Sequence, residues 1–442
     1  MMQAKYQHFA IFMMLALAFA FCIHRDMQIE KQYTVDLRNR VVGARLQKDG
    51  KLPYFYRWRP VDGLRYYDPN KLDTTYANAI TASPFFHHLL FPIADLPQRK
   101  ISQIWLALEY FMFLSCVLIA FSFTGNLRQQ WAVVIAAVLL LFTQAWVVHI
   151  IAGQMYIVFP FLAFIFLFCF IRKEHLLFSF LSGLAAATII LIRPTCTLFF
   201  LPFLPLLKTF RAKHALLFFL PAILLSGYSI LNTKERSYWM EYRKAIAAHI
   251  KDHQSDDLSE RTIAYKPVIY KEWEGWSLDS IHQARIKFPV QWLSESSSIG
   301  IFSKQAFHKT IPVWVINSIL LLTIAGLLIF WFKQNNSAKS GMVLTALFGF
   351  CVYMISDFIS PLWRIQYYGV QWAFPLLLLS AFYDKRLRTI YLLLLAGLLL
   401  NILNTPWLKM RHTIGELIIL VTLLWVCFSP KARLINEKKL SL

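Results

Sequence analysis

The chain has 442 residues, of which 57% are hydrophobic, 16% aromatic and 16% charged, and its mean hydropathy is +0.49. This composition excludes a soluble globular protein and predicts an all-α multi-pass membrane protein. The 45 basic and 24 acidic residues give a net charge of +21, which in a soluble chain would suggest nucleic-acid binding. In a membrane protein we interpret this excess as basic anchors at anionic lipid headgroups together with sites for a phosphate.

Apolar runs are long and numerous enough to predict many membrane spans. Because a bilayer core of about 30 Å takes about 20 apolar residues of helix, the chain predicts about twelve spans. They lie at residues 9–24, 103–123, 131–150, 155–171, 176–192, 195–207, 214–231, 312–332, 341–359, 367–383, 387–403 and 413–429. The first is interpreted as a membrane helix, because no clear cleavage site of a signal peptide follows it. Pro194, Pro202, Pro205 and Pro221 interrupt the middle of the series, which predicts broken helices around a cavity.

Basic residues in the short connections predict the orientation. With the N-terminus inside, sixteen of them lie on the inner side: Lys5, Arg128, Arg172, Lys173, Lys208, Arg211, Lys213, Lys333, Lys339, Lys385, Arg386, Arg388, Lys431, Arg433, Lys438 and Lys439. Four lie on the outer side: Arg193, Arg364, Lys409 and Arg411. This bias predicts a cell-membrane protein with both termini in the cytoplasm and two long extracytoplasmic loops, residues 25–102 and 232–311.

We expect residues 1–442 to form a single membrane-embedded domain whose aqueous chemistry takes place in these two loops. The loops are rich in Tyr, Trp, Arg and Lys. Such residues suit sugars stacked on aromatic faces and phosphates held by cations. Amphipathic residues lying on lipid headgroups would give the same composition, and this alternative remains open.

Asp36 is the most informative candidate residue, in the run YTVDLRNRVVGARLQKDG that follows the first span. Because Arg38, Arg40 and Arg45 come after it, two interpretations remain open. Asp36 is either a catalytic base at the membrane surface or one partner of a structural salt bridge to these arginines.

The predicted topology places four further polar residues on the same outer face: Arg193, Arg364, His149 and Gln154. An arginine in hydrocarbon costs roughly 2.5 to 3.5 kcal/mol on insertion scales. We therefore expect Arg193, in LIRPT between the fifth and sixth spans, to face protein, water or an anion, with a plain interfacial anchor as the alternative. His149 is either a contact to the substrate or a helix-end residue satisfied by backbone.

Three stretches of the chain carry a family resemblance. The first combines Asp36 with GKLPY at 50–54 and TASPFFHHLLFPIADLP before the second span. The second runs from IIAGQMYIVFP through the basic turn IRKEH and a Gly-Ala-rich helix to LIRPT, and the third is ISPLWRIQYYGVQWAFPLL. In their order and spacing these stretches resemble glycosyltransferase family 87, the polyprenol-phosphate-dependent mannosyltransferases of the C-type superfamily. The resemblance covers residues 30–210 and 355–380.

The resemblance implies a C-type glycosyltransferase fold and an integral membrane hexosyltransferase. Such an enzyme moves a hexose, by the family's default mannose, from a polyprenyl-phosphate sugar to an extracytoplasmic glycolipid or glycan acceptor. In the family, an acid at the position of Asp36 is the proposed base for single displacement with inversion. Arg193 and Arg364 are then the first choices to stabilise the departing phosphate, because a guanidinium fork matches phosphate geometry.

The chain departs from the family pattern in two places. Arg193 stands where a lysine is common, and the Ser-Pro element is followed by Trp363-Arg364 and Tyr367-Tyr368 where histidines are expected. Since these residues also bind phosphate or sugar, we include Tyr367 among the predicted substrate-binding residues, beside His149 and Gln154. His87 and His88 either lie over the site or mark the membrane interface.

No metal site and no cofactor are expected. His249 and His253 have the i, i+4 spacing of a metal pair, but no third ligand is evident and the segment is polar, which favours a solvated helix. The six cysteines lie in or beside apolar runs without close pairing, which is typical of small buried hydrophobes.

Two other functions remain open. A polymerase of surface polysaccharide or an O-antigen ligase also combines about twelve spans with large external loops. In that case the second loop carries the site, through Arg236, Arg243, His249, Arg261 and Arg285. A transporter or flippase of lipid-linked sugars would bind its substrate without chemistry and would be expected to show paired inverted halves, of which the sequence gives no convincing sign.

Overall fold

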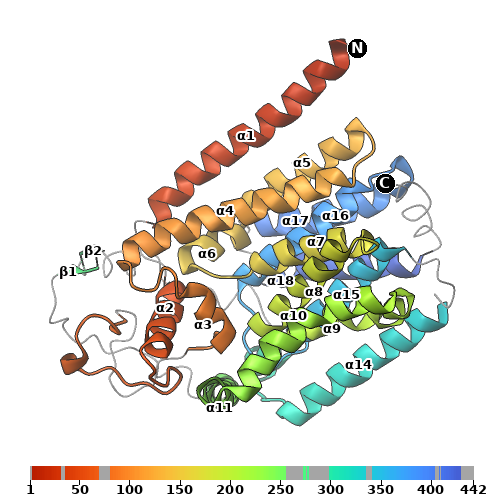
Figure 1. Ribbon diagram of the computed structural model, residues 1–442. Coiled ribbons are helices and arrows are strands. Elements are labelled where there is room, and N and C mark those ends of the chain that lie inside the picture. The colour runs from red at the N-terminus through yellow and green to blue at the C-terminus, as the bar shows by residue number, and fades with distance from the viewer. Residues whose placement is uncertain are drawn as a thin grey trace.

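The computed structural model describes residues 2–30, 35–68, 80–254, 272–274, 276–277, 298–334, 341–403, 408 and 410–429. Within these residues nearly all regular structure is helical, as predicted (Figure 1). The exception is an antiparallel pair of strands of two residues each, β1 (Glu272–Trp273) and β2 (Trp276–Ser277). The fold is that of a helical membrane protein.

The helices form a bundle with a smaller helical layer at one end. The bundle holds α1 (Met2–Glu30), α4 (Gln98–Ser122), α5 (Leu127–Leu141), α6 (Gln144–Ala152), α7 (Val158–Ile171), α8 (Leu176–Ile192), α10 (Ala212–Leu231), α14 (Val313–Gln334), α15 (Met342–Phe358), α16 (Ala373–Ala381), α17 (Arg388–Ile402) and α18 (Arg411–Phe428). The end layer holds α2 (Val35–Lys48), α3 (Pro84–Leu90) and α11 (Thr233–Gln254), and α13 (Ile299–Phe307) precedes α14.

Each predicted span has a helical counterpart, yet only some of these helices meet the requirements for crossing a membrane. By length and composition, five of the described helices do so: α1, α4, α10, α14 and α18. A sixth is the pair α5 and α6, bent by 54°. The bend follows from Thr143, whose hydroxyl accepts the amide N–H of Trp146 at 3.2 Å and so starts a new helix. The number of twelve spans stays a prediction.

Three of the four prolines, Pro194, Pro202 and Pro205, shape the backbone as predicted. The chain after α8 is 3₁₀ helix at η2 (Pro194–Cys196), a single α turn at α9 (Thr197–Phe200), and 3₁₀ again at η3 (Leu201–Thr209). Pro202 and Pro205 both fall in η3, where they withhold the amide donors of a regular α-helix. Pro221 is different, because it lies inside α10 without ending it.

Small residues bring some helices into close contact, as is common in membrane bundles. A Cβ atom at Gly183 of α8 would lie 1.9 Å from the carbonyl oxygen of Phe218 in α10. Likewise, a Cβ at Gly397 of α17 would lie 2.6 Å from the carbonyl oxygen of Gly415 in α18. Only glycine permits these two crossings.

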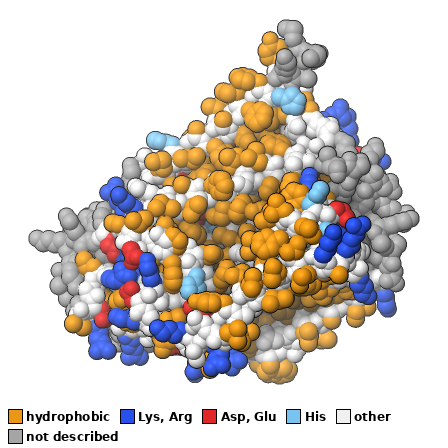
Figure 2. Space-filling view, viewed as in Figure 1, with side chains coloured by type: hydrophobic (Ala, Val, Ile, Leu, Met, Phe, Trp, Pro, Cys, Tyr) orange, Lys and Arg blue, Asp and Glu red, His pale blue; other side chains and the backbone are white. Residues whose placement is uncertain are grey.

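Phenylalanines fill the centre of the bundle. Phe166 of α7 makes edge-to-face contacts with Phe199, Phe200 and Phe203, with ring centroids 5.0 to 6.0 Å apart. The surface around this core is also apolar, and Figure 2 shows hydrophobic side chains covering the middle of one face while most charged side chains gather toward its ends. A bilayer would meet such a surface without burying charge.

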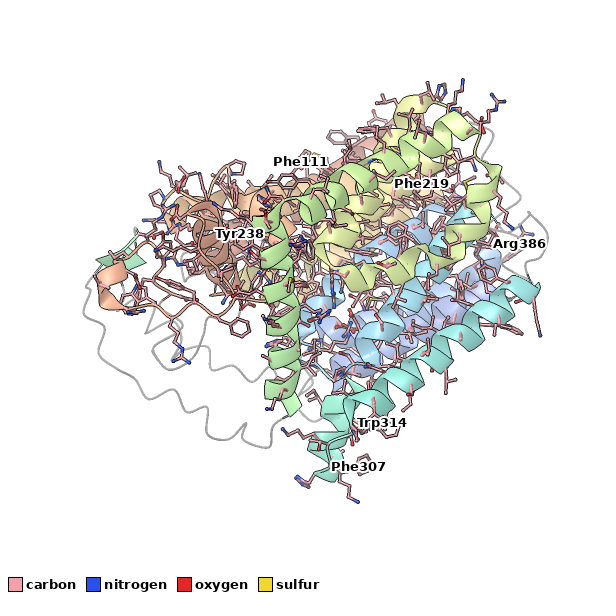
Figure 3. The ribbon with its side chains drawn as sticks, turned by 60° about the horizontal axis from the view of Figure 1, so that its bottom comes forward. Phe111, Phe219, Tyr238, Phe307, Trp314 and Arg386 are labelled. Carbon is pink, nitrogen blue, oxygen red and sulfur yellow. The ribbon has the colours of Figure 1, made fainter. Side chains whose placement is uncertain are left out.

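The end layer is fastened by the arginines of α2. Arg45 donates to the carboxylate of Glu274 at 2.6 Å and to the carbonyl oxygen of Ala94 at 2.6 Å. Arg38 donates to the carbonyl oxygen of Tyr67 at 2.7 Å. Arg38 and Arg45 are therefore scaffold residues that hold the first loop. Figure 3 shows this layer, in which Tyr238 of α11 is labelled, at the opposite end of the bundle from Arg386.

Candidate functional site

Asp36 lies in the first turn of α2, where the positive end of the helix dipole stabilises a carboxylate. The side-chain amide of Gln154 donates a hydrogen bond to Asp36, and the oxygen of the same amide accepts one from Arg40. No ion pair within 4.0 Å joins Asp36 to an arginine among the described residues. Arg40 thus acts on Asp36 through Gln154, while Arg38 and Arg45 bind elsewhere.

The position of Gln154 follows from the glycine before it. Gly153 ends α6 in the left-handed conformation at φ 62°, which costs glycine little. The turn is closed by the amide N–H of Gln154, which donates to the carbonyl oxygen of His149 at 3.1 Å. Arg40 fixes the same turn by donating to the carbonyl oxygen of Gly153 at 2.9 Å. The predicted Gly-Gln element is therefore one of the contacts between the bundle and α2.

Asp36 is half-buried, and its surroundings change its proton affinity. Burial raises its pKa above the usual value, and the nearby Asp68 raises it further. Arg40 and the hydrogen bond from Gln154 act in the opposite direction without cancelling the effect of burial. The result is a carboxylate that holds a proton more strongly than an aspartate in water.

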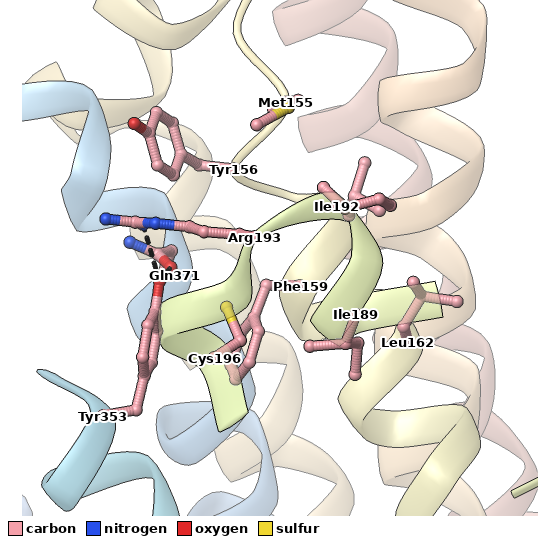
Figure 4. A pocket seen from close by; sticks show the side chains of 11 residues that line it. Met155, Tyr156, Phe159, Leu162, Ile189, Ile192, Arg193, Cys196, Tyr353 and Gln371 are labelled. Atoms are coloured by element: carbon pink, nitrogen blue, oxygen red, sulfur yellow. Dashed lines mark hydrogen bonds between the residues drawn. The ribbon is translucent and has the colours of Figure 1, made fainter. Parts of the chain in front are cut away.

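Arg193 lies at the break between α8 and η2. Because Pro194 disfavours helical geometry in the residue before it, Arg193 is extended at φ −143° and leaves the helix axis. Its guanidinium donates to the carboxylate of Asp357 at 2.7 Å and to the hydroxyl of Tyr353 at 2.6 Å. Figure 4 shows it reaching from the break toward Tyr156 and Tyr353.

A ring of hydrogen bonds supports this ion pair. Tyr353 and Asp357 lie one turn apart on α15, and Gln371 of η4 (Gln366–Trp372) joins them. The hydroxyl of Tyr353 donates to the amide oxygen of Gln371 at 2.6 Å, and the amide nitrogen of Gln371 donates to Asp357 at 3.4 Å. Arg193 uses two of its five N–H groups in this ring, which leaves others for a ligand.

Three tyrosines, Tyr156, Tyr367 and Tyr368, form an aromatic group that we call the tyrosine cluster. The ring of Tyr156 lies 5.4 Å from that of Tyr367 and 4.3 Å from that of Tyr368. The guanidinium of Arg193 lies 5.3 and 5.2 Å from the rings of Tyr156 and Tyr368. Asp36 is within electrostatic reach of the Tyr367 hydroxyl. Asp36 thus reaches the tyrosine cluster by its charge and through Gln154, two residues before Tyr156, whereas the guanidinium of Arg193 lies directly against the cluster.

The cavity beside Arg193 is small. It has a volume of about 20 Å³ and is lined by Tyr156, Arg193, Cys196, Tyr353 and Gln371 together with apolar side chains (Figure 4). This is room for about one water molecule. A sugar would need the tyrosine cluster or the adjacent loops to move.

The structure gives Arg364 a different environment from the predicted one. Its guanidinium is fully buried and forms an ion pair with the buried carboxylate of Glu416 on α18. It also lies over the rings of Phe358 and Tyr368, at 4.3 and 5.6 Å. In this position Arg364 supports the tyrosine cluster from behind and does not present its charge to a phosphate.

His149 is likewise turned into the protein. Its Nε2 atom lies 3.1 Å from the carboxylate of Glu109 on α4, and both side chains are fully buried. His149 is therefore a buried partner of Glu109 in the helix that delivers Gln154. The direct substrate contact proposed for it would require this pair to open.

His87 and His88 occupy different positions on α3. His87 is buried between α2 and α3, where its Nδ1 atom lies 3.0 Å from the amide oxygen of Gln47. Burial lowers its pKa to about 3, so the ring stays neutral. His88 contacts the carboxylate of Glu235 on α11 at 3.0 Å. Both therefore join elements of the end layer to one another.

Four residues of this region were missed in the sequence. Asp357 and Glu416 neutralise the two predicted arginines, Glu109 pairs with His149, and Gln371 completes the ring around Arg193. The carboxylates lie in apolar runs, where an ionisable residue is by default a functional candidate, and that signal was available. In the part of the chain that the structure describes, no three His, Cys, Asp or Glu residues are placed to hold a metal ion.

Comparison with known proteins adds no family to this description, since no family model, curated protein or solved structure matches the chain. The fold and the polar residues at one end of the bundle define a helical membrane protein with a candidate site built on Asp36, Gln154, Arg193 and the tyrosine cluster.

Proposed function

We propose that the protein is a membrane hexosyltransferase that uses a polyprenyl-phosphate sugar as donor, with Asp36 as the base. The observation that carries the proposal is the joint placement of Asp36 and Arg193 at the tyrosine cluster. A carboxylate with raised proton affinity and a guanidinium with spare donors are what single displacement from a sugar phosphate requires. The resemblance to family 87 supplies the donor class and mannose as the default sugar.

The reaction assigns one task to each group. Asp36 takes the proton of an acceptor hydroxyl while the oxygen of that hydroxyl forms a bond to the anomeric carbon of the hexose. The bond from that carbon to the phosphate oxygen breaks, with inversion at carbon. The polyprenyl phosphate leaves with the bonding electrons, and Arg193 stabilises the negative charge on it. No metal, oxidant or other co-reactant is needed for the balance.

The tyrosine cluster provides the surface for the sugar in this proposal. Aromatic rings offer flat apolar faces with polar hydroxyls at their edges, which match the two kinds of surface on a hexose. Tyr156 and Tyr368 also contact the guanidinium of Arg193. A hexose held on this cluster would have its phosphate near Arg193 and its acceptor near Asp36.

Replacing Asp36 with Asn tests the proposal. In membranes supplied with a polyprenyl-phosphate hexose and an acceptor fraction, we expect Asp36→Asn to reduce transfer by about 10²- to 10⁴-fold, the usual contribution of general base catalysis. Asp95→Asn is the matched control, because Asp95 lies in the same loop and forms exposed ion pairs with Lys48 and Arg65. Unchanged transfer by folded Asp36→Asn protein would refute the assignment.

One observation favours the second candidate function, a polysaccharide polymerase or ligase. Arg236, Arg243 and Lys244 of α11 line a separate groove of about 550 Å³, which they share with Trp239 and with α8 and α10. His249 lies on the same helix, whereas Arg261 and Arg285 fall outside the described residues. If Arg243→Gln abolishes glycan assembly while Asp36→Asn does not, this second function replaces the first. Movement of lipid-linked sugar without a new glycosidic bond would instead indicate a transporter.

A further inference from the structure

A second groove lies at the end of the bundle away from Asp36. It has a volume of about 420 Å³ and lies between α5, α16 and α17. The helix directions give its position. The chain runs from α5 through α6 to Gln154 at the candidate site, and α16 runs away from the tyrosine cluster. The groove mouth, at the start of α5 and just before α17, is therefore far from that site. Figure 3 shows Arg386, the residue after Lys385, at this end.

The groove is apolar along its length and has small residues where α5 and α16 face it. Ala132, Ala136 and Ser380 leave space that larger side chains would fill. Ile135, Leu139 and Leu398 form apolar walls. In a bilayer a groove of this kind faces acyl chains and not water, so the natural occupant is a hydrocarbon chain.

The mouth of the groove is cationic and aromatic. Arg128 and Lys385 both line it and are both exposed. Neither forms an ion pair with any described residue, since the acid beside Lys385, Asp384, binds Arg386 at 3.1 Å. Trp131 and Tyr391 lie near the mouth, as aromatic residues do at the level of lipid headgroups. This end of the groove is complementary to an anion.

The length of the groove matches one leaflet of a membrane. From Arg128 to Leu139 the helix α5 advances eleven residues, which is about 16 Å at 1.5 Å per residue. Half of a hydrocarbon core of about 30 Å is about 15 Å. A lipid with its phosphate at Arg128 would therefore have its acyl chain along the groove as far as the bilayer midplane.

We propose that this groove is a binding site for a glycerophospholipid with an anionic headgroup. One acyl chain lies between α5, α16 and α17, and the phosphate lies between Arg128 and Lys385. On the predicted topology this is the cytoplasmic leaflet, whose anionic lipids attract basic residues. The site is independent of glycosyl transfer, so neither proposal stands or falls with the other.

Thermal stability of the full-length protein, purified and delipidated in detergent, tests the proposal. Phosphatidylglycerol and phosphatidylcholine with the same acyl chains are titrated in parallel, with inorganic phosphate as a third ligand. We expect phosphatidylglycerol to bind at least about tenfold more tightly than phosphatidylcholine, since two cations at the mouth attract its net negative headgroup. Inorganic phosphate should not stabilise the protein, because it lacks the chain that the groove accepts.

Two variants separate the headgroup from the chain. Arg128→Gln with Lys385→Gln should abolish the preference for phosphatidylglycerol, whereas Arg386→Gln, which removes the adjacent charge outside the groove, should preserve it. Ala132→Phe should fill the groove and weaken binding of both lipids. Equal binding of both lipids by the native protein, or full binding by Ala132→Phe, would overturn the proposal. So would a change from dimer to monomer in Ala132→Phe, which would make a second copy of the chain the occupant.

Discussion

Gln154 joins Asp36 to Arg40, donating to the carboxylate with its amide nitrogen and accepting from the guanidinium with its amide oxygen. In this position the amide keeps the carboxylate of Asp36 out of direct contact with the guanidinium of Arg40 and links the two by hydrogen bonds. A direct Asp–Arg ion pair would fix Asp36 as a permanently charged structural residue. The bridged arrangement leaves Asp36 with a raised pKa, which is the state a general base requires.

The pH dependence of transfer should reveal the raised pKa of Asp36. Because the base must be unprotonated, activity falls as the pH drops through the raised pKa of Asp36. Asp68 raises that pKa through its negative charge, so Asp68→Asn should move the acid limb of the profile to lower pH. The measurement is the transfer rate in membranes from pH 3.5 to 8. An acid limb that does not move would separate Asp68 from the titrating group.

Arg193 and Asp357 should be coupled in stability but not in activity. Arg193→Gln leaves the buried carboxylate of Asp357 without its cation, which should lower the free energy of unfolding by about 3 to 5 kcal/mol. Adding Asp357→Asn should recover most of this loss, because the pair becomes neutral. Transfer should stay low in the double variant, since the cation for the phosphate is absent. Recovered transfer there would exclude Arg193 as the phosphate ligand.

His87 should make the protein sensitive to acid. Its pKa is lowered from about 6.5 to about 3 by burial, so the folded chain excludes a proton that the unfolded chain accepts. Below about pH 6.5 the free energy of unfolding should fall by up to about 1.4 kcal/mol per pH unit until about pH 3. His87→Gln should flatten this part of the stability curve, whereas His8→Gln, on the exposed surface of α1, should leave it unchanged.

Gly183 and Gly227 form a matched pair for testing the packing of α8 against α10. Gly183→Ala would place a Cβ 1.9 Å from a backbone oxygen and should cost about 1 to 3 kcal/mol or more. Gly227 of α10 has open space around its Cβ position, so Gly227→Ala should be neutral or stabilise by about 0.5 to 1 kcal/mol through helix propensity. Melting temperatures of the two variants in one detergent compare them directly.

Several features of the fold were predictable because they depend on local composition. Hydropathy located the helices, and Thr143 and Pro194 explain the breaks at α6 and after α8. The element containing Gly153 and Gln154 was predicted to lie on the same face of the membrane as Asp36, and in the structure Gln154 donates a hydrogen bond to Asp36. The number of spans does not follow in the same way, because a run such as 131–150 is apolar throughout yet bends by 54°.

The environment of the charged residues was less predictable, since it depends on partners distant in the chain. Arg364 pairs with Glu416, and Arg193 pairs with Asp357. A hydropathy window averages Glu109, Asp357 and Glu416 into their apolar surroundings. The sequence placed Arg193 and Arg364 on one face, but it did not show that Arg364 is fully buried in its ion pair while Arg193 is partly exposed. For the same reason, the separation of Arg40 from Arg38 and Arg45 required the structure.

Measuring transfer and stability together in Asp36→Asn decides whether Asp36 is a base or a structural salt-bridge partner. Since the raised pKa means that the charged form of Asp36 costs free energy at neutral pH, the neutral variant should melt at the same or a higher temperature. It should also lose at least about a hundredfold in transfer. A lower melting temperature with transfer retained would instead show that Asp36 is a structural acid.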